Sequence, residues 1–216
     1  DTTGIPVRLA DAMELIDRTT DFIVSNQHLQ LVDELATSKR FKNIKLLNYV
    51  DEYDPDVQKQ FAAMTYRLSL DTYLVVFRGT DDTLIGWKED FHMTYMDHVP
   101  AQKRAASYLQ HVMKEFPKGR FLVAGHSKGG NLATYACSYL PDSLFERVDA
   151  IYSYDAPGLN KAIIETEGYQ RTSPNIRRFV PQGSIVGMML EVPEPTTIVK
   201  SHAFGGFAQH DAFTWE

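Results

Sequence analysis

Hydrophobic and polar positions along the chain follow two kinds of pattern. Apolar residues spaced three or four apart predict helices, and short apolar runs predict strands. Apolar residues recur every three or four positions over 6–25, where Pro6 is a favourable first helical residue. We expect a helix there and a second one around 27–38. Apolar runs predict strands at 61–70 and 72–77, and the second run is continuous enough for a sheet that is covered on both faces.

After these two strands, helical and strand patterns take turns until the end of the chain. The pattern predicts helices at 84–96, 100–116 and 132–140, and strands at 121–124, 149–154, 176–180 and 196–201. Such alternation is typical of an α/β fold, with a mainly parallel central sheet and helices on both faces. Because no linker or repeat interrupts the pattern, we expect one domain over 1–216, with a helical N-terminal part at 1–60 and a core at 61–216.

Composition is that of a globular protein and argues against several classes of function. The chain is 44% hydrophobic and 23% charged, with a net charge of −6 and no long run of Lys or Arg, so we expect no nucleic-acid partner. No apolar stretch reaches the roughly 18 residues of a membrane span. Cys137 is the only cysteine, and we interpret it as a small buried residue. With no secretory signal visible, a cytoplasmic location is expected.

One serine has the surroundings of a catalytic nucleophile. Ser127 lies in the segment 125–130, Gly-His-Ser-Lys-Gly-Gly, between a predicted strand and a predicted helix. The glycines let strand and helix approach closely, and the sharp turn exposes the serine side chain. The helix N-terminus offers N–H groups where an oxyanion would form. The alternative is a structural glycine-rich turn that happens to contain a serine.

Three motifs together resemble the class 3, or fungal-type, lipases. They are Val-Phe-Arg-Gly-Thr at 76–80, then Trp87 and Asp90, and the serine turn continued to residue 133. The resemblance is closer to a bacterial lipase-like family of unassigned function that has Gly-His-Ser-Lys-Gly-Gly-Asn at this turn, and it covers roughly residues 60–216. It implies an α/β-hydrolase fold and hydrolysis of lipid or acyl esters without a cofactor. The sequence has no His-Glu-x-x-His motif and no pair of cysteines, so we expect no metal site.

The resemblance also implies an oxyanion hole and a lid. Thr80 takes the role of side-chain donor, although it could instead cap the following helix, and the backbone N–H of Lys128 is the second donor. The segment after Thr80 corresponds to the lipase lid. There Leu84 and Trp87 would contact an acyl chain, or would belong to an ordinary amphipathic helix. The Lys128 side chain would attract an anionic head group, or would be solvated at the start of its helix.

Two of the seven histidines can serve as the base, because this fold places the histidine after the nucleophile and the acid in the chain. We favour His210, which follows a predicted loop after the last strand and matches a Gln-His-Asp motif of the bacterial family. His202 is the second choice. His126 adjoins the nucleophile, but the lipases keep a histidine there without using it as the base.

The acid is where the sequence departs from the lipases. Ser184 stands where their aspartate would follow the strand at 176–180, and a neutral hydroxyl can orient an imidazole but cannot stabilise an imidazolium by charge. Asp155, one strand earlier in an Asp-x-Pro-Gly stretch, also follows the carboxyl end of a strand, and we favour it. Ser184 with a water, Asp211 and an impaired site remain open. Asp155 could also be a turn-forming residue.

These residues predict a serine hydrolase of the lipase or esterase kind. Ser127 would attack an ester carbonyl, His210 would carry the proton and Asp155 would orient His210, with a small-molecule ester or lipid as substrate. The alternative is a degenerate hydrolase that binds a lipid or a partner without turnover. An acyl transferase or thioesterase would share the same three residues. The oligomeric state stays open.

Overall fold

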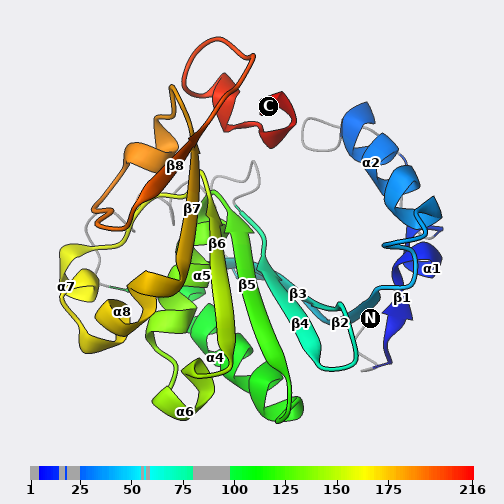
Figure 1. Cartoon of the computed structure of the whole chain (residues 1–216), viewed down its shortest axis with the longest axis horizontal. Helices are drawn as coiled ribbons and strands as arrows, with labels where there is room; N and C mark the ends of the chain where they lie inside the picture. Colours follow the sequence, from blue (N-terminus) through cyan, green and yellow to red (C-terminus); the bar gives the residue numbers. More distant parts are fainter. Residues whose placement is uncertain (1–4, 15–17, 19–24, 55, 57–58, 80–97) are drawn as a thin grey trace.

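The fold is built on one twisted sheet, seen in a computed structural model that describes residues 5–14, 18, 25–54, 56, 59–79 and 98–216 (Figure 1). Among these residues the strands pair in sequential order from β1 to β8. Strands β1 to β4 pair antiparallel and strands β4 to β8 pair parallel. Their bounds are β1 Val7–Arg8, β2 Lys45–Asp54, β3 Lys59–Arg67, β4 Thr72–Phe77, β5 Arg120–His126, β6 Val148–Tyr154, β7 Ile176–Pro181 and β8 Thr196–Val199.

Helices lie between β1 and β2 and between consecutive parallel strands from β4 to β7. The α-helices are α1 Leu9–Met13, α2 Asn26–Thr37, α4 Pro100–Glu115, α5 Lys128–Ser138, α6 Asp142–Phe145, α7 Lys161–Ile164 and α8 Glu167–Thr172. Short 3₁₀ turns follow as η1 Ser173–Asn175, η2 Val186–Met188, η3 Ala208–His210 and η4 Ala212–Thr214. None of the helices that the structure describes has both the length and the apolar character needed to cross a membrane.

The core lies on one face of the parallel sheet. Helix α5 packs on β4, β5 and β6, and it contacts α4 on one side and α8 on the other. Strand residues that face these helices, such as Val75, Phe121 and Val123, are buried, whereas their neighbours on the other face, such as Leu74 and Leu122, are only half-buried. Sequential parallel strands with right-handed crossovers place their helices on one side. The α/β class is therefore confirmed, but the described helices do not cover the two faces evenly.

Local patterns predicted most elements well and the N-terminal part poorly. Helices α2, α4 and α5 and strands β3 to β8 lie where expected, and β4 matches its predicted bounds. The helix expected over 6–25 is wrong in its first part, because Val7–Arg8 pairs with β2 and α1 is only five residues long. The helical N-terminal part at 1–60 is likewise corrected, since it contains the ten-residue strand β2. The helix expected at 84–96 lies outside the described residues.

Strand β2 escaped prediction because its sequence does not mark it as a strand. Much of it is exposed and charged, and its register against β3 shifts between Leu47 and Val50, where Asn48 has a φ of 53°. A strand that is largely exposed is stabilised by pairing with its neighbour. The spacing of apolar residues within the strand does not reveal this pairing. The carboxyl ends of the parallel strands β4 to β8 lie together at one edge of the sheet. The candidate site is built at this edge.

Candidate active site

Ser127 occupies the turn between β5 and α5 in a strained conformation. Its φ of 56° and ψ of −132° are unusual for a residue with a side chain, and such outliers concentrate at functional sites. The Ser127 N–H donates to the Tyr154 carbonyl at 2.9 Å, and the Ser127 carbonyl accepts from the Gly130 N–H at 3.0 Å. The turn is therefore held on both sides, with the Ser127 side chain partly exposed.

The glycines around this turn are required by close backbone approaches. A Cβ on Gly125 would collide with the Gly129 carbonyl, and one on Gly129 would collide with the Phe77 carbonyl. A Cβ on Gly79 would lie 2.9 Å from the His126 carbonyl oxygen and 3.3 Å from Ser127 Cβ. The end of β4 is thus packed directly against the serine turn.

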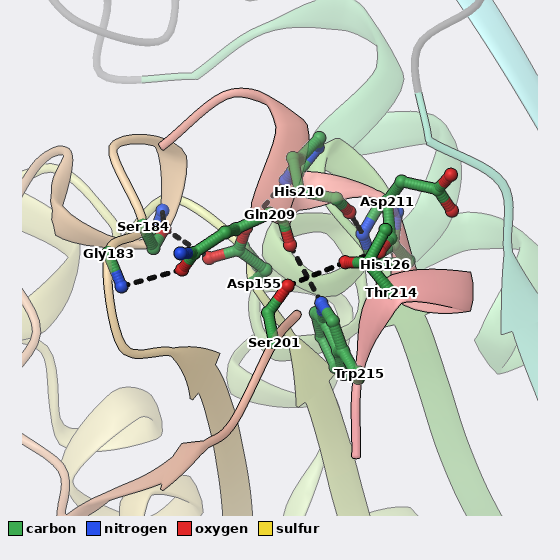
Figure 2. Close-up of polar contacts among 12 residues, drawn as sticks. His126, Asp155, Gly183, Ser184, Ser201, Gln209, His210, Asp211, Thr214 and Trp215 are labelled. Atoms are coloured by element: carbon green, nitrogen blue, oxygen red, sulfur yellow. Dashed lines mark hydrogen bonds and ion pairs between the residues drawn. The ribbon is translucent and has the colours of Figure 1, made fainter. Parts of the chain in front are cut away.

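His210 and Asp155 form a hydrogen-bonded pair at the same edge of the sheet (Figure 2). Asp155 follows β6, is fully buried and has a φ of 42°, while His210 closes η3 and is partly exposed. His210 Nδ1 lies 2.6 Å from Asp155 Oδ2. Because a carboxylate only accepts, Nδ1 carries the hydrogen of the pair, which leaves the lone pair of a neutral imidazole on Nε2.

Gln209 and Trp215 hold the loop that carries His210. The Gln209 side chain accepts from the Gly183 N–H at 2.8 Å and donates to the Ala203 carbonyl at 3.0 Å. The Trp215 indole N–H donates to the Gln209 carbonyl at 2.7 Å. These contacts fix the loop on both sides of the imidazole, and Figure 2 labels Gly183, Gln209 and Trp215 around it. The sequence did not single out Gln209 or Trp215 as site residues, since their partners are distant or depend on the loop conformation.

His126 supports His210 rather than competing with it. Its Nε2 lies 2.8 Å from the His210 carbonyl, so Nε2 is the donor, and the two ring centroids are 4.4 Å apart. Burial, followed by the proximity of His210, lowers the pKa of His126 to about 4. At neutral pH this imidazole is therefore uncharged and holds the backbone of His210 next to the serine turn.

Ser184 contacts Asp155. Its hydroxyl donates to Asp155 Oδ1, so one carboxylate oxygen meets Ser184 and the other meets His210. The other two residues weighed earlier lie elsewhere: the Asp211 side chain caps η4 through the Phe213 N–H at 2.9 Å, and His202 is exposed.

The side chain of Lys128 is buried, which overturns both expectations for it. It is 1% exposed, and its Nζ donates to the Gln60 carbonyl at 3.1 Å, at the start of β3. An ammonium in this position is neither solvated nor available to a head group in solution. The helix start lies against the sheet, so the side chain extends toward β3 instead of into water. Cys137 is buried as expected, and burial raises the pKa of its thiol.

A sequence-family comparison decides the family of the chain. The model described as Mbeg1-like matches residues 35–216, which is most of the chain. This chain belongs to the Mbeg1-like family. The match begins well before residue 60, so it includes β2, which the lipase resemblance had left out. No curated protein matches the chain.

Solved fungal lipases share the fold of this Mbeg1-like protein. The Rhizopus microsporus var. chinensis lipase is 20% identical with a TM-score of 0.51, over 73% of this chain and 61% of the lipase. The native propeptide complex of Rhizomucor miehei lipase is 16% identical with a TM-score of 0.50, over 73% and 57%. The N225Q mutant of Penicillium cyclopium MDLA is 13% identical with a TM-score of 0.50, over 93% and 77%. The fold is thus an α/β-hydrolase fold, and the chain spans about 60% of the length of the first two lipases.

The predicted site residues of this Mbeg1-like protein are only partly described. His210 and Asp155 are brought together, and Ser127 follows the histidine that packs on His210. Thr80, Leu84 and Trp87 lie outside the described residues. Within the part of the chain that is described, no hydrogen bond joins the Ser127 hydroxyl to the His210 ring; such catalytic contacts often tighten only with substrate bound. The described residues also contain no group of three or more His, Cys, Asp or Glu that could hold a metal ion.

Proposed function

We propose that this protein is a serine ester hydrolase that cleaves lipid or acyl esters through an acyl-enzyme. One observation supports this most: a histidine paired at 2.6 Å with a buried carboxylate sits beside a serine in a strained strand-to-helix turn. A serine hydroxyl is a weak nucleophile until a base removes its proton, and the base works best when a third group orients it. Ser127, His210 and Asp155 supply these three groups.

The reaction follows from the positions of the protons. Ser127 Oγ attacks the ester carbonyl while His210 Nε2 takes the serine proton. The imidazolium is stabilised because its Nδ1–H remains bonded to the Asp155 carboxylate. When the tetrahedral intermediate collapses, the alcohol leaves with the proton from Nε2. A water then attacks the acyl-enzyme by the same route, which releases the acid and restores the Ser127 hydroxyl.

The negative oxygen of the intermediate is assigned to the N-terminus of α5. The backbone N–H of Lys128 begins this helix, and helix N-termini favour negative charge. We propose Thr80 as the second donor and Leu84 and Trp87 as contacts for the acyl chain. Their support is the motif resemblance and the position of Gly79, which places the end of β4 against Ser127.

The competing function is a binding module without turnover. Its support is the serine at position 184, where the lipases have their catalytic aspartate. Because the carboxylate of Asp155 lies within hydrogen-bond reach of His210, a serine at 184 does not leave the histidine without an acid. Acyl transfer and thioester hydrolysis use the same three residues. Competing alcohol or thiol acceptors in the assay would detect acyl transfer, and thioester substrates would detect thioester hydrolysis.

Ester turnover tests the proposal. The full chain, Ser127→Ala and the control Ser143→Ala are assayed on p-nitrophenyl esters of increasing acyl length. Ser143 is exposed on α6, which leads into the amino end of β6, whereas the site lies at the carboxyl ends of the strands. We expect Ser127→Ala to lower kcat by about 10³-fold or more, and Ser143→Ala to match the wild type. Equal rates in wild type and Ser127→Ala would refute the mechanism.

A further inference from the structure

We propose that Ser184 is a positioning residue that holds the Asp155 carboxylate in the orientation that His210 requires. The inference deepens the proposed function and rests on it. In this role the Ser184 hydroxyl acts on the Asp155 carboxylate and does not contact the substrate.

The direction of the hydrogen bonds carries the inference. The Gly187 N–H donates to Ser184 Oγ at 2.8 Å, so one lone pair of that oxygen is occupied. The single hydroxyl hydrogen is therefore free to point at Asp155 Oδ1. Since His210 holds Oδ2, both carboxylate oxygens have a partner and rotation of the carboxylate would break one of the two bonds. Ser184 thus fixes the angle at which the carboxylate faces the imidazole.

The loop that carries Ser184 is shaped around the carboxylate. A Cβ on Gly187 would lie 2.5 Å from Asp155 Oδ1 and 3.1 Å from Ser184 Oγ, so the backbone there packs directly on both groups. Asp155 itself is fully buried with a φ of 42°, in the left-handed region that few residues other than glycine adopt.

Arg178 joins the two loops beneath the acid. Its buried guanidinium donates to the Ala156 carbonyl at 2.8 Å and to the Gly187 carbonyl. One cation thereby ties the residue after Asp155 to the loop of Ser184. The separation between Ser184 and Asp155 is consequently set by a rigid support, so the hydroxyl is held in place and not merely nearby.

The geometry also predicts that the acid can be exchanged between the two positions. The Asp155 carboxylate fills the space between Ser184 Oγ and the His210 ring. Shortening residue 155 to serine empties this space, and lengthening residue 184 to aspartate places a carboxylate into it. The double variant therefore still has one carboxylate and one hydroxyl. The carboxylate is now at position 184, and the hydroxyl of the serine at position 155 faces it.

The experiment compares five forms of the full chain: wild type, Ser184→Ala, Ser184→Thr, Asp155→Ser, and Asp155→Ser combined with Ser184→Asp. Hydrolysis of a short-chain p-nitrophenyl ester gives kcat and KM, and circular dichroism with thermal unfolding checks the fold. Proton NMR of each form follows the His210 Nδ1–H, which resonates far downfield when bonded to a carboxylate. The NMR signal does not depend on turnover.

We expect Ser184→Ala to lower kcat about tenfold with KM unchanged and to weaken the downfield signal, whereas Ser184→Thr, which keeps the hydroxyl, restores both. Asp155→Ser should lose the signal and at least about 100-fold in kcat, and the added Ser184→Asp should recover the signal and at least tenfold of the rate. A folded Ser184→Ala with wild-type kcat and signal, or a folded double variant no better than Asp155→Ser, would overturn the inference. Failure of the proposed function is distinct: Ser127→Ala would then hydrolyse the ester like the wild type.

Discussion

His210 Nδ1 lies 2.6 Å from Asp155 Oδ2, although the two residues are 55 positions apart in the chain. Asp155 follows β6, and His210 lies on the loop after β8, so the pair spans three strands of the sheet edge. The carboxylate is fully buried and the imidazole partly exposed, as expected for an acid that orients a base facing substrate. Buried acids are rarely kept without a partner, and this one has two.

Asp155→Asn should reduce ester hydrolysis by about 10³- to 10⁴-fold in kcat. The amide keeps the shape of the carboxylate but favours the wrong imidazole tautomer and supplies no charge to the imidazolium. Steady-state kinetics on a p-nitrophenyl ester measure the loss. Asp211→Asn is the matched control, because Asp211 adjoins His210 in the chain but caps η4, and it should stay within about threefold of the wild type. Comparable losses in the two variants would contradict the assignment of the acid.

His126 should make the folded state less stable as the pH falls. Its pKa is lowered from 6.5 to about 4 in the folded protein, chiefly by burial, so between these values the unfolded chain binds a proton that the folded chain does not. This contribution to stability is complete above about pH 6.5 and is lost as the pH falls toward 4.

Urea unfolding at pH 7.5 and 4.5 measures this loss. The wild type should lose about 2–3 kcal/mol more than His126→Gln, which cannot titrate. His111→Gln, at an exposed position on α4, is the control and should follow the wild type. An identical pH dependence in wild type and His126→Gln would show that His126 is not buried as described.

Lys128 should resist chemical modification in the native protein. Its side chain is 1% exposed and its Nζ is bonded to the Gln60 carbonyl, whereas Lys103 on α4 is exposed. With an amine-acetylating reagent and peptide mass spectrometry, we expect Lys128 to react at least about tenfold more slowly than Lys103. In 8 M urea, a concentration typical of full unfolding, the two should react alike. Rapid native acetylation of Lys128 would restore the solvated or head-group-binding interpretation.

Gly129→Ala should destabilise the fold by about 2–4 kcal/mol, because the added Cβ would collide with the Phe77 carbonyl at the end of β4. Thermal unfolding by circular dichroism gives the comparison. Gly205→Ala is the control: it has a φ of +93° but no atom within 4 Å of the added Cβ, and should cost about 1 kcal/mol. Similar losses in the two variants would mean that the close approach of strand and turn is absent.

The candidate site could be predicted from the sequence where its signals are local. The turn at Ser127 was recognisable because a strand, a glycine-rich turn and a helix follow one another without interruption. Asp155 was recognisable as a residue after a strand's carboxyl end, since the ends of parallel strands meet at one edge. Ser184 stood out only as a departure from the lipases, and its contact with Asp155 needed the structure.

Features that depend on distant neighbours were missed. The burial of Lys128 depends on β3, and β2 is stabilised by pairing with β3, so neither leaves a periodic signal of its own. The support of His210 by His126 links residues 84 positions apart. In each case the contact joins two separate elements or loops, and the spacing of apolar residues within one segment does not report it.

Labelling by a fluorophosphonate probe tests the central claim most directly. The reagent phosphonylates only a serine that a base has activated, so it reports the nucleophile without knowledge of the substrate. We expect wild type and Ser143→Ala to be labelled and Ser127→Ala not to be labelled. His210→Ala should be labelled far more slowly, and peptide mapping should find the adduct on Ser127. Equal labelling of wild type and Ser127→Ala, or no labelling of the folded wild type, would contradict the account.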